Sequence, residues 1–282
     1  MTPALLAALG VLLAGPVPAL LARWRGLRRT PRAAMLLWQG VALAAVLSAL
    51  GAGLSLATDH GAGLVGGLAL GVTAVVAVRL LVSGHRVGTS LRAVRRHHRE
   101  QLDLLATPPG ADRPGISVLE TERPLAYCVP GVQASRVVVS SGTLARLAPD
   151  ELDAVLAHER AHLRARHDLV LEAFSVLHRA FPRWVSSAAA LREVRTLVEV
   201  LADRAASRQY GARPVARALV TLAGAPAPDA ALGAAGGALV ERIELLDVRR
   251  HPVQAMVVCL GAVAVVVVPT AFVAVPWLRG LG

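Results

Sequence analysis

The chain has 282 residues, of which 55% are hydrophobic and 3% aromatic, and its 30 basic and 19 acidic residues give a net charge of +11. A soluble domain of this length is rarely so apolar, so the composition indicates membrane-spanning segments. Two cysteines, one of them in an apolar segment, argue against the disulfide framework of an oxidised secreted module.

Four apolar segments are long enough to cross about 30 Å of hydrocarbon, which takes roughly 20 helical residues. They cover residues 4–22, 33–57, 62–82 and 254–275. The first segment lacks the positively charged start of a cleaved signal peptide, and Pro16 and Pro18 are expected to kink it. We therefore expect three transmembrane helices in residues 1–84, a domain in residues 85–252, and a fourth transmembrane helix with a short tail in residues 253–282.

The arginines that flank these segments predict an orientation. Five arginines lie between the first two spans, none lies in the turn at residues 58–61, five follow the third span, and Arg249 and Arg250 precede the fourth. The positive-inside rule then places the N-terminus outside and the domain of residues 85–252 in the cytoplasm. Every basic residue is arginine, a bias typical of a GC-rich bacterial gene, so we expect a bacterial plasma membrane. Arginines beside apolar segments also explain the basic charge without nucleic acid as a partner.

The domain of residues 85–252 begins with a basic helical pattern at Leu91–Leu105, and prolines then interrupt the chain. Three strand-like runs follow, and they predict a small, mainly antiparallel sheet. These runs are Ile116–Leu119, Leu125–Val129 and Arg136–Ser140.

Helical patterns begin at Pro149, where a proline and two acidic residues suit a first helical turn. Two further helices are predicted over Leu169–Ala180 and Ser187–Tyr210. The expected fold class is a mainly α integral membrane protein with four transmembrane helices and a cytoplasmic α+β domain.

The helix that begins at Pro149 carries the motif H-E-x-x-H in His158, Glu159 and His162. Residues four apart lie on one face of a helix, so both imidazoles can bind one Zn²⁺. Glu159 is then placed beside the metal, where it can take a proton from a bound water, the chemistry of peptide-bond hydrolysis. The motif predicts His158 and His162 as zinc ligands and Glu159 as the catalytic base.

A catalytic zinc usually has three protein ligands and a water. Glu199 and Asp203 lie four residues apart on one face of the Ser187–Tyr210 helix. We predict that Glu199 is the third ligand and that Asp203 hydrogen-bonds a zinc-bound imidazole from behind. Glu193 is an alternative ligand that lacks a similarly spaced acid, and a solvated acidic pair flanked by arginines is the alternative interpretation.

Other polar residues have plainer expected roles. Cys128 is expected to be a small strand residue rather than a ligand. His167 and Asp168 are expected to cap a helix end or to support the metal ligands, and His178 is expected to pack on an apolar helix. Tyr210 or a nearby arginine is a candidate for stabilising the oxyanion.

The order of these motifs over residues 85–225 resembles the BlaR/MecR-type integral-membrane zinc metallopeptidases, metallopeptidase family 56. The segments that carry the resemblance are Glu122–Gly131, the Val-Val-Val-Ser-Ser-Gly run from Val137, Glu151–His162 and Glu199-x-x-x-Asp203. The heat-shock membrane protease and CaaX prenyl protease group is a more distant relative.

The resemblance implies a zincin-like (gluzincin) domain with zinc on His158, His162 and Glu199. It also implies that Glu159 acts as the base. Beta-lactam receptors of this type carry an extracellular sensor after the last span, whereas about seven residues follow Val275 here, so antibiotic sensing by this chain alone is not expected.

The sequence therefore predicts a membrane-integrated zinc endopeptidase that cuts a cytoplasmic or membrane-associated protein. The substrate is expected to bind as an extended peptide against a sheet edge. The resemblance points to Leu125–Val129 as that edge, whereas the sequence alone equally allows a plain core strand there. The resemblance also suggests a repressor-like regulator and a role in signalling. The alternative is a non-catalytic zinc-containing membrane signalling or scaffold protein, but a structural zinc site has no need of Glu159. The pattern indicates no oligomeric state.

Overall fold

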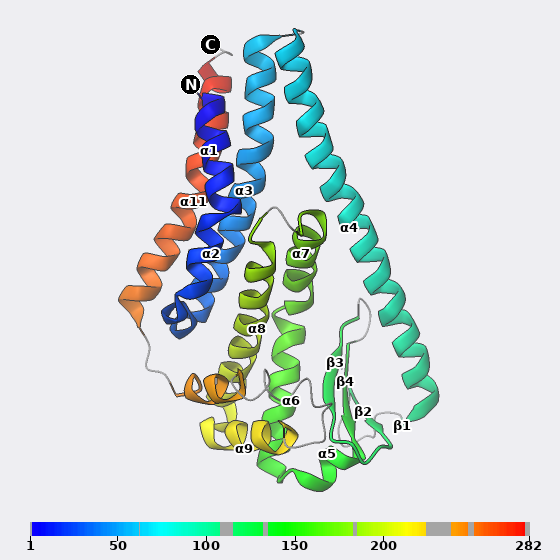
Figure 1. Ribbon diagram of the computed structural model, residues 1–282. Helices are drawn as coiled ribbons and strands as arrows, with labels where there is room; N and C mark the ends of the chain where they lie inside the picture. The colour runs from blue at the N-terminus through cyan, green and yellow to red at the C-terminus, as the bar shows by residue number, and fades with distance from the viewer. Residues whose placement is uncertain are drawn as a thin grey trace. The chain divides into compact units, whose positions relative to one another are not determined.

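The computed structural model describes residues 2–61, 63–107, 115–131, 135–182, 185–223, 238–247 and 251–279 (Figure 1). The chain forms two compact units. The first contains residues 1–87, 171–197 and 250–282, and the second contains residues 88–170 and 198–249. Residues 171–197, which the sequence places inside the domain of residues 85–252, belong to the first unit.

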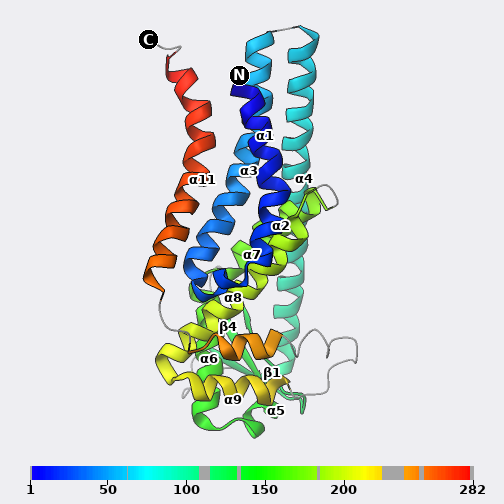
Figure 2. The ribbon, with the colours of Figure 1, turned by 60° about the vertical axis from the view of Figure 1, so that its left-hand side comes forward.

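The first unit is built from apolar helices. Four helices among the described residues are long and apolar enough to cross a membrane. They cover Pro3–Arg23, Pro31–His60, Leu64–Leu105 and Pro252–Phe272. The helix α3 (Pro31–His60) lies beside α1 (Thr2–Ala14) and α11 (Pro252–Arg279), as Figures 1 and 2 show. The positions agree with the four predicted spans, and they support a membrane protein; the orientation stays a prediction.

The first span is broken at Gly15 into α1 and α2 (Pro16–Arg23), as its prolines predicted. Pro18 has no N–H to donate to the carbonyl of Ala14, four residues earlier. Ser186 supplies the missing donor, because its backbone N–H lies 2.9 Å from the Ala14 oxygen. Its hydroxyl also donates to the Gly15 oxygen at 2.8 Å, in addition to the longer bond of 3.4 Å from the Ala19 N–H. The break is therefore compatible with an apolar environment, where unpaired carbonyls are costly.

The helix α4 (Leu64–Leu105) runs for 42 residues without a break. The third span and the basic helix expected at Leu91–Leu105 are parts of this one helix. No proline lies between residues 83 and 105, so nothing in the sequence ends the helix where the apolar stretch ends. The short strand β1 (Ala106–Thr107) follows directly.

The second unit contains a four-stranded sheet in the order β1-β2-β4-β3. The strands β2 (Ile116–Leu119), β3 (Ala126–Val129) and β4 (Arg136–Ser140) match the three predicted runs. The central pair β2 and β4 is parallel, whereas β3 pairs with β4 and β1 with β2 in the antiparallel sense. Two of the three described strand pairs are antiparallel, which agrees with the predicted mainly antiparallel sheet. The central pair is parallel because β3 lies outside β4 and not between β2 and β4.

The end of β4 fixes this strand order by holding the loop that leads to β3. Ser141 Oγ accepts from the N–H of Thr121 at 3.0 Å, and Ser140 Oγ accepts from the N–H of Leu125 at 2.9 Å. The N–H of Gly142 donates to the Thr121 carbonyl at 2.9 Å, and a Cβ at position 142 would collide with the carbonyl of Glu122. The loop therefore crosses close to the end of β4 and delivers β3 to the outer edge.

Helices cover the rest of the second unit. They are α5 (Ser141–Arg146), α6 (Pro149–Arg164), the start of α7 (His167–Ala180), the C-terminal part of α8 (Ser187–Tyr210), α9 (Ala212–Ala223) and residues 238–244. Glu151 accepts a hydrogen bond from the N–H of Ala148 at 3.1 Å and so closes the first turn of α6. Leu152 and Leu156 of α6 pack with Val139 of the sheet and Ala218 of α9. This core fixes α6 against both the sheet and α9.

Replacing Gly142 by alanine tests the anchored loop. We expect Gly142→Ala to lower the thermal unfolding midpoint and the yield of folded protein, because the new methyl group must displace the Glu122 carbonyl. Gly71→Ala is the control, since a Cβ at Gly71 meets nothing within 4 Å. Equal midpoints for the two variants, measured by thermal denaturation in detergent, would contradict the role given to the loop.

Candidate metal centre

The helix α6 carries His158, Glu159 and His162, and the first two follow one turn after Val155 of its packed core. The Nε2 atoms of His158 and His162 lie 3.1 Å apart, on successive turns. The helix α8 brings Glu199 to the same point, with Oε2 at 3.6 Å from His158 Nε2 and Oε1 at 3.6 Å from His162 Nε2. All of these residues belong to the second unit.

These three side chains fit one zinc ion. One ligand atom from each lies within 4.8 Å of the others, in the one such group among the described residues. A tetrahedral zinc with bonds of about 2.0–2.2 Å separates its ligand atoms by roughly 3.3–3.5 Å. The observed separations of 3.1 and 3.6 Å lie on either side of that range. Two imidazoles and one carboxylate are also a donor set typical of catalytic zinc.

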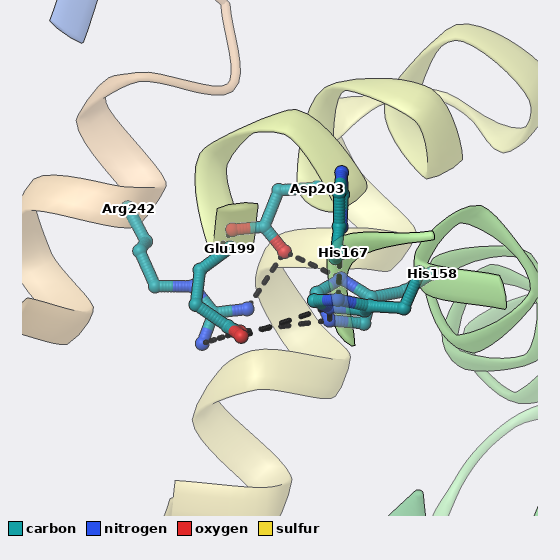
Figure 3. Close-up of polar contacts among 6 residues, drawn as sticks. His158, His167, Glu199, Asp203 and Arg242 are labelled. Atoms are coloured by element: carbon teal, nitrogen blue, oxygen red, sulfur yellow. Dashed lines mark hydrogen bonds and ion pairs between the residues drawn. The ribbon is translucent and has the colours of Figure 1, made fainter. Parts of the chain in front are cut away.

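Asp203 lies behind His158, one turn of α8 after Glu199 (Figure 3). Its Oδ1 is 2.9 Å from His158 Nδ1, and the residue is only 1% exposed. Burial alone would raise the pKa of Asp203, but hydrogen bonds from Arg242 and His158 outweigh it and hold the pKa below its usual value. Asp203 is thus an ionised acceptor that fixes His158 with a proton on Nδ1 and a lone pair on Nε2.

His167 contacts the other imidazole. The Nδ1 atoms of His162 and His167 lie 3.0 Å apart, and His167 is 5% exposed. Burial, together with the charges of neighbouring His158 and His167, lowers the pKa of His162 to about 3, and burial also lowers the pKa of His167. With both rings neutral, a lone pair on His162 Nε2 requires that His162 Nδ1–H donate to His167 Nδ1.

The position of His167 depends on the junction between α6 and α7. Arg166 adopts a φ of 50°, the one positive φ among described residues other than glycine. This left-handed residue interrupts the helical backbone between α6 and α7, and His167 then lies against His162. A non-glycine residue in this conformation is uncommon, and its place beside a metal-ligand group points to a functional constraint.

Glu159 lies next to His158 and is partly buried. Burial raises the pKa of Glu159, and the opposing effects of His158 and of a hydrogen bond with Cys128 do not cancel that rise. Burial and the adjacent Glu159 raise the pKa of Cys128 to about 12, so its thiol stays protonated and donates to the carboxylate. Cys128 therefore contacts the expected base and is not a member of the ligand group.

Arg242 completes the cluster, and the sequence analysis did not single it out. Its Nε and Nη2 donate to the two oxygens of Asp203 at 2.7 and 2.8 Å, and its Nη1 lies 3.2 Å from Glu199 Oε2 (Figure 3). Arg242 comes from residues 238–244, and no motif spacing links it to α6 or α8. Arginines are common in this chain, so nothing in the sequence distinguishes this one.

Three other expected residues lie elsewhere. Glu193, the alternative ligand, belongs to the first unit, where its Oε2 accepts from Arg28 Nε at 3.1 Å. Tyr210 packs against the apolar cluster that includes Ala206, and the described residues that line the cavity at the centre do not include it. His178 Nδ1 lies 3.1 Å from the Ser187 hydroxyl, in the first unit, which fits a packed side chain.

The sequence model of Peptidase family M48 matches residues 93–250, more than half of the chain. The chain belongs to Peptidase family M48. The match spans the H-E-x-x-H helix, Glu199 and Arg242, and it supports the prediction of a metallopeptidase. No curated protein and no solved structure matches the chain. The narrower expectation of a BlaR/MecR-type member of family 56 stays a prediction.

Removing His167 tests its support of His162. We expect His167→Ala to weaken zinc binding by roughly 10- to 100-fold, because His162 loses the acceptor that sets its tautomer and ring orientation. His167→Asn keeps an acceptor and should recover part of the affinity. Competition with a chelator measures the affinity, and the visible spectrum of the Co²⁺-loaded protein reports the ligand geometry. His97→Ala, at an exposed position on α4, is the control, and equal affinities for His167→Ala and His97→Ala would contradict this role.

Arg242→Met tests the ion pair with Asp203. The variant leaves a buried carboxylate without its main cation, and we expect a loss of stability of about 3–5 kcal/mol, as for other broken buried pairs. Adding Asp203→Asn to Arg242→Met should recover part of the loss, which a double-mutant cycle by thermal denaturation would measure. The matched control is Arg217→Met, on the exposed face of α9. A midpoint for Arg242→Met as high as that of the control would show that the pair is not stabilising.

Proposed function

We propose that this chain is a membrane-integrated zinc endopeptidase. In this proposal His158, His162 and Glu199 bind the zinc, Glu159 is the general base and acid, and Asp203 orients His158. The observation that carries it is the convergence of three ligand atoms within 4.8 Å, beside Glu159, in a chain of Peptidase family M48. The four long apolar helices support attachment to the lipid bilayer.

A bound zinc would polarise the scissile carbonyl and activate a water. Glu159 takes the proton from that water and later returns it to the leaving amine. Its raised pKa brings the carboxyl closer to neutral pH, where a group can both accept and release a proton. The Cys128 thiol holds one side of this carboxylate, while Asp203 and His167 hold the two imidazoles in place.

The substrate is proposed to bind as an extended peptide along β3. The strand β3 is an edge of the sheet, because β4 is its only neighbour among the described strands. Ala126 of β3 lines the same cavity as His158 and Glu159, so a peptide added to this edge would pass the metal centre. Leu125–Val129 as substrate edge was the expectation from the resemblance, and the strand order supports it.

The cellular setting follows from the sequence. The distribution of arginines favours a bacterial plasma membrane with the N-terminus outside and the peptidase domain in the cytoplasm. The natural substrate is then a cytoplasmic or membrane-associated protein. The resemblance to BlaR/MecR-type peptidases favours a repressor-like regulator, and nothing in the sequence favours nucleic acid as a partner.

Glu159→Gln separates catalysis from metal binding. We expect the variant to keep its zinc and to cleave at least roughly 100-fold more slowly, since general base catalysis contributes 10²–10⁴-fold. His158→Ala should lose both zinc and activity. Elemental analysis of purified protein and protease profiling of membranes measure the two properties. Glu100→Gln, at an exposed site on α4, is the control, and a chelator should abolish wild-type cleavage until zinc is restored.

The competing function is a non-catalytic membrane signalling or scaffold protein with a structural zinc. It predicts full cellular function for Glu159→Gln and no peptide that depends on Glu159 in the membrane profile. If Glu159→Gln cuts a substrate at the wild-type rate, the proposed mechanism is wrong.

A further inference from the structure

A large apolar cavity adjoins the metal centre within the second unit. Its volume is about 490 Å³, within the roughly 300–1,000 Å³ range of binding pockets. Its polar lining consists of His158, Glu159, Glu199, Asp203 and Arg242. The remaining walls come from α6, α9, residues 238–239 and Ala126 of β3, and they carry aliphatic side chains.

The helix α9 supplies the longest of these walls. Val215, Ala218, Leu219 and Leu222 line the cavity at spacings of three and four residues, which places them on one helical face. Val220 lies on another face and is 54% exposed. Val155 of α6 and Leu239 complete the apolar part of the cavity.

Apart from Glu159, the charged side chains at this cavity are already paired with one another. Arg242 binds both oxygens of Asp203 and lies 3.2 Å from Glu199, and Asp203 also accepts from His158. A charged substrate side chain would enter among aliphatic groups and lose its hydration without gaining a partner. An aliphatic or aromatic side chain would bury its surface at no such cost.

We propose that this cavity is the specificity pocket of the enzyme and that it takes a large aliphatic or aromatic side chain of the substrate, next to the scissile bond. The proposal rests on the proposed peptidase function. A peptide paired with β3 directs alternate side chains to one side of the sheet, and Ala126 joins that strand to the cavity wall. The residue beside the scissile bond can therefore enter the cavity while its carbonyl lies at the metal centre.

Cleavage of a combinatorial peptide library by the full-length, zinc-loaded protein in detergent tests the proposed specificity pocket. Mass spectrometry of the products should show Leu, Met or Phe beside the cut, with kcat/KM roughly 10- to 200-fold above that of the matching Ala peptide. Leu222→Trp fills the cavity and should remove this preference while Ala peptides are still cut. Leu219→Arg should shift the preference toward acidic side chains. Val220→Trp, on the exposed face of the same helix, should leave the preference unchanged.

The same library, retained on immobilised Glu159→Gln protein, gives a readout that needs no turnover. Retained peptides should be enriched in Leu, Met and Phe, and the added change Leu222→Trp should abolish the enrichment. Cleavage without an apolar preference, or a preference that survives Leu222→Trp, overturns the pocket and leaves the peptidase standing. Apolar enrichment without any cleavage by the wild type overturns the peptidase and leaves the pocket standing. Retention without apolar enrichment overturns the pocket.

Discussion

The metal centre depends on one buried carboxylate, Asp203, held between His158 and Arg242. A buried ionised carboxylate is costly unless it is paired and hydrogen-bonded, and here both oxygens accept from Arg242 while one also accepts from His158. The three residues come from α8, α6 and residues 238–244, so the pairings join three segments that are far apart in sequence. The orientation of His158, and with it the position of Glu199, follows from this connection.

Much of the fold could be predicted because its signals are local. The strands β2 and β4 and the helix α8 have the expected bounds, since apolar patterns and turn residues delimit them. The strand order could not be predicted, because it depends on hydrogen bonds between the loop before β3 and residues about 15–20 positions later, at the end of β4. The continuity of α4 was missed for another reason, which is that a change from apolar to basic composition ends a span but does not end a helix.

The metal centre likewise contains residues that local sequence patterns predict and residues that they do not. His158 and His162, and likewise Glu199 and Asp203, are spaced i, i+4 on single helices, so the sequence itself indicates that each pair shares a face. The contact between these faces of α6 and α8 belongs to the tertiary structure. In the sequence, only the presence of both motifs in one chain suggested it. Arg242 has no such spacing, because its partners lie about 40 residues away. The contact of His167 with His162 depends on the positive φ of Arg166. An arginine in the sequence gives no indication of this left-handed conformation.

An arginine beside a cation site is at first unexpected, and the surrounding acids explain it. Glu159, Glu199 and Asp203 lie close together, and like charges so near one another favour protonation. Arg242 faces Asp203 with two donors and Glu199 with a third, which fixes both carboxylates in place and lowers the pKa of Asp203. Glu159 has no such partner, and its pKa is raised. The centre thus contains two kinds of carboxylate. Asp203 and Glu199 are fixed by Arg242 and suited to supporting and binding a metal, whereas Glu159 is suited to exchanging a proton.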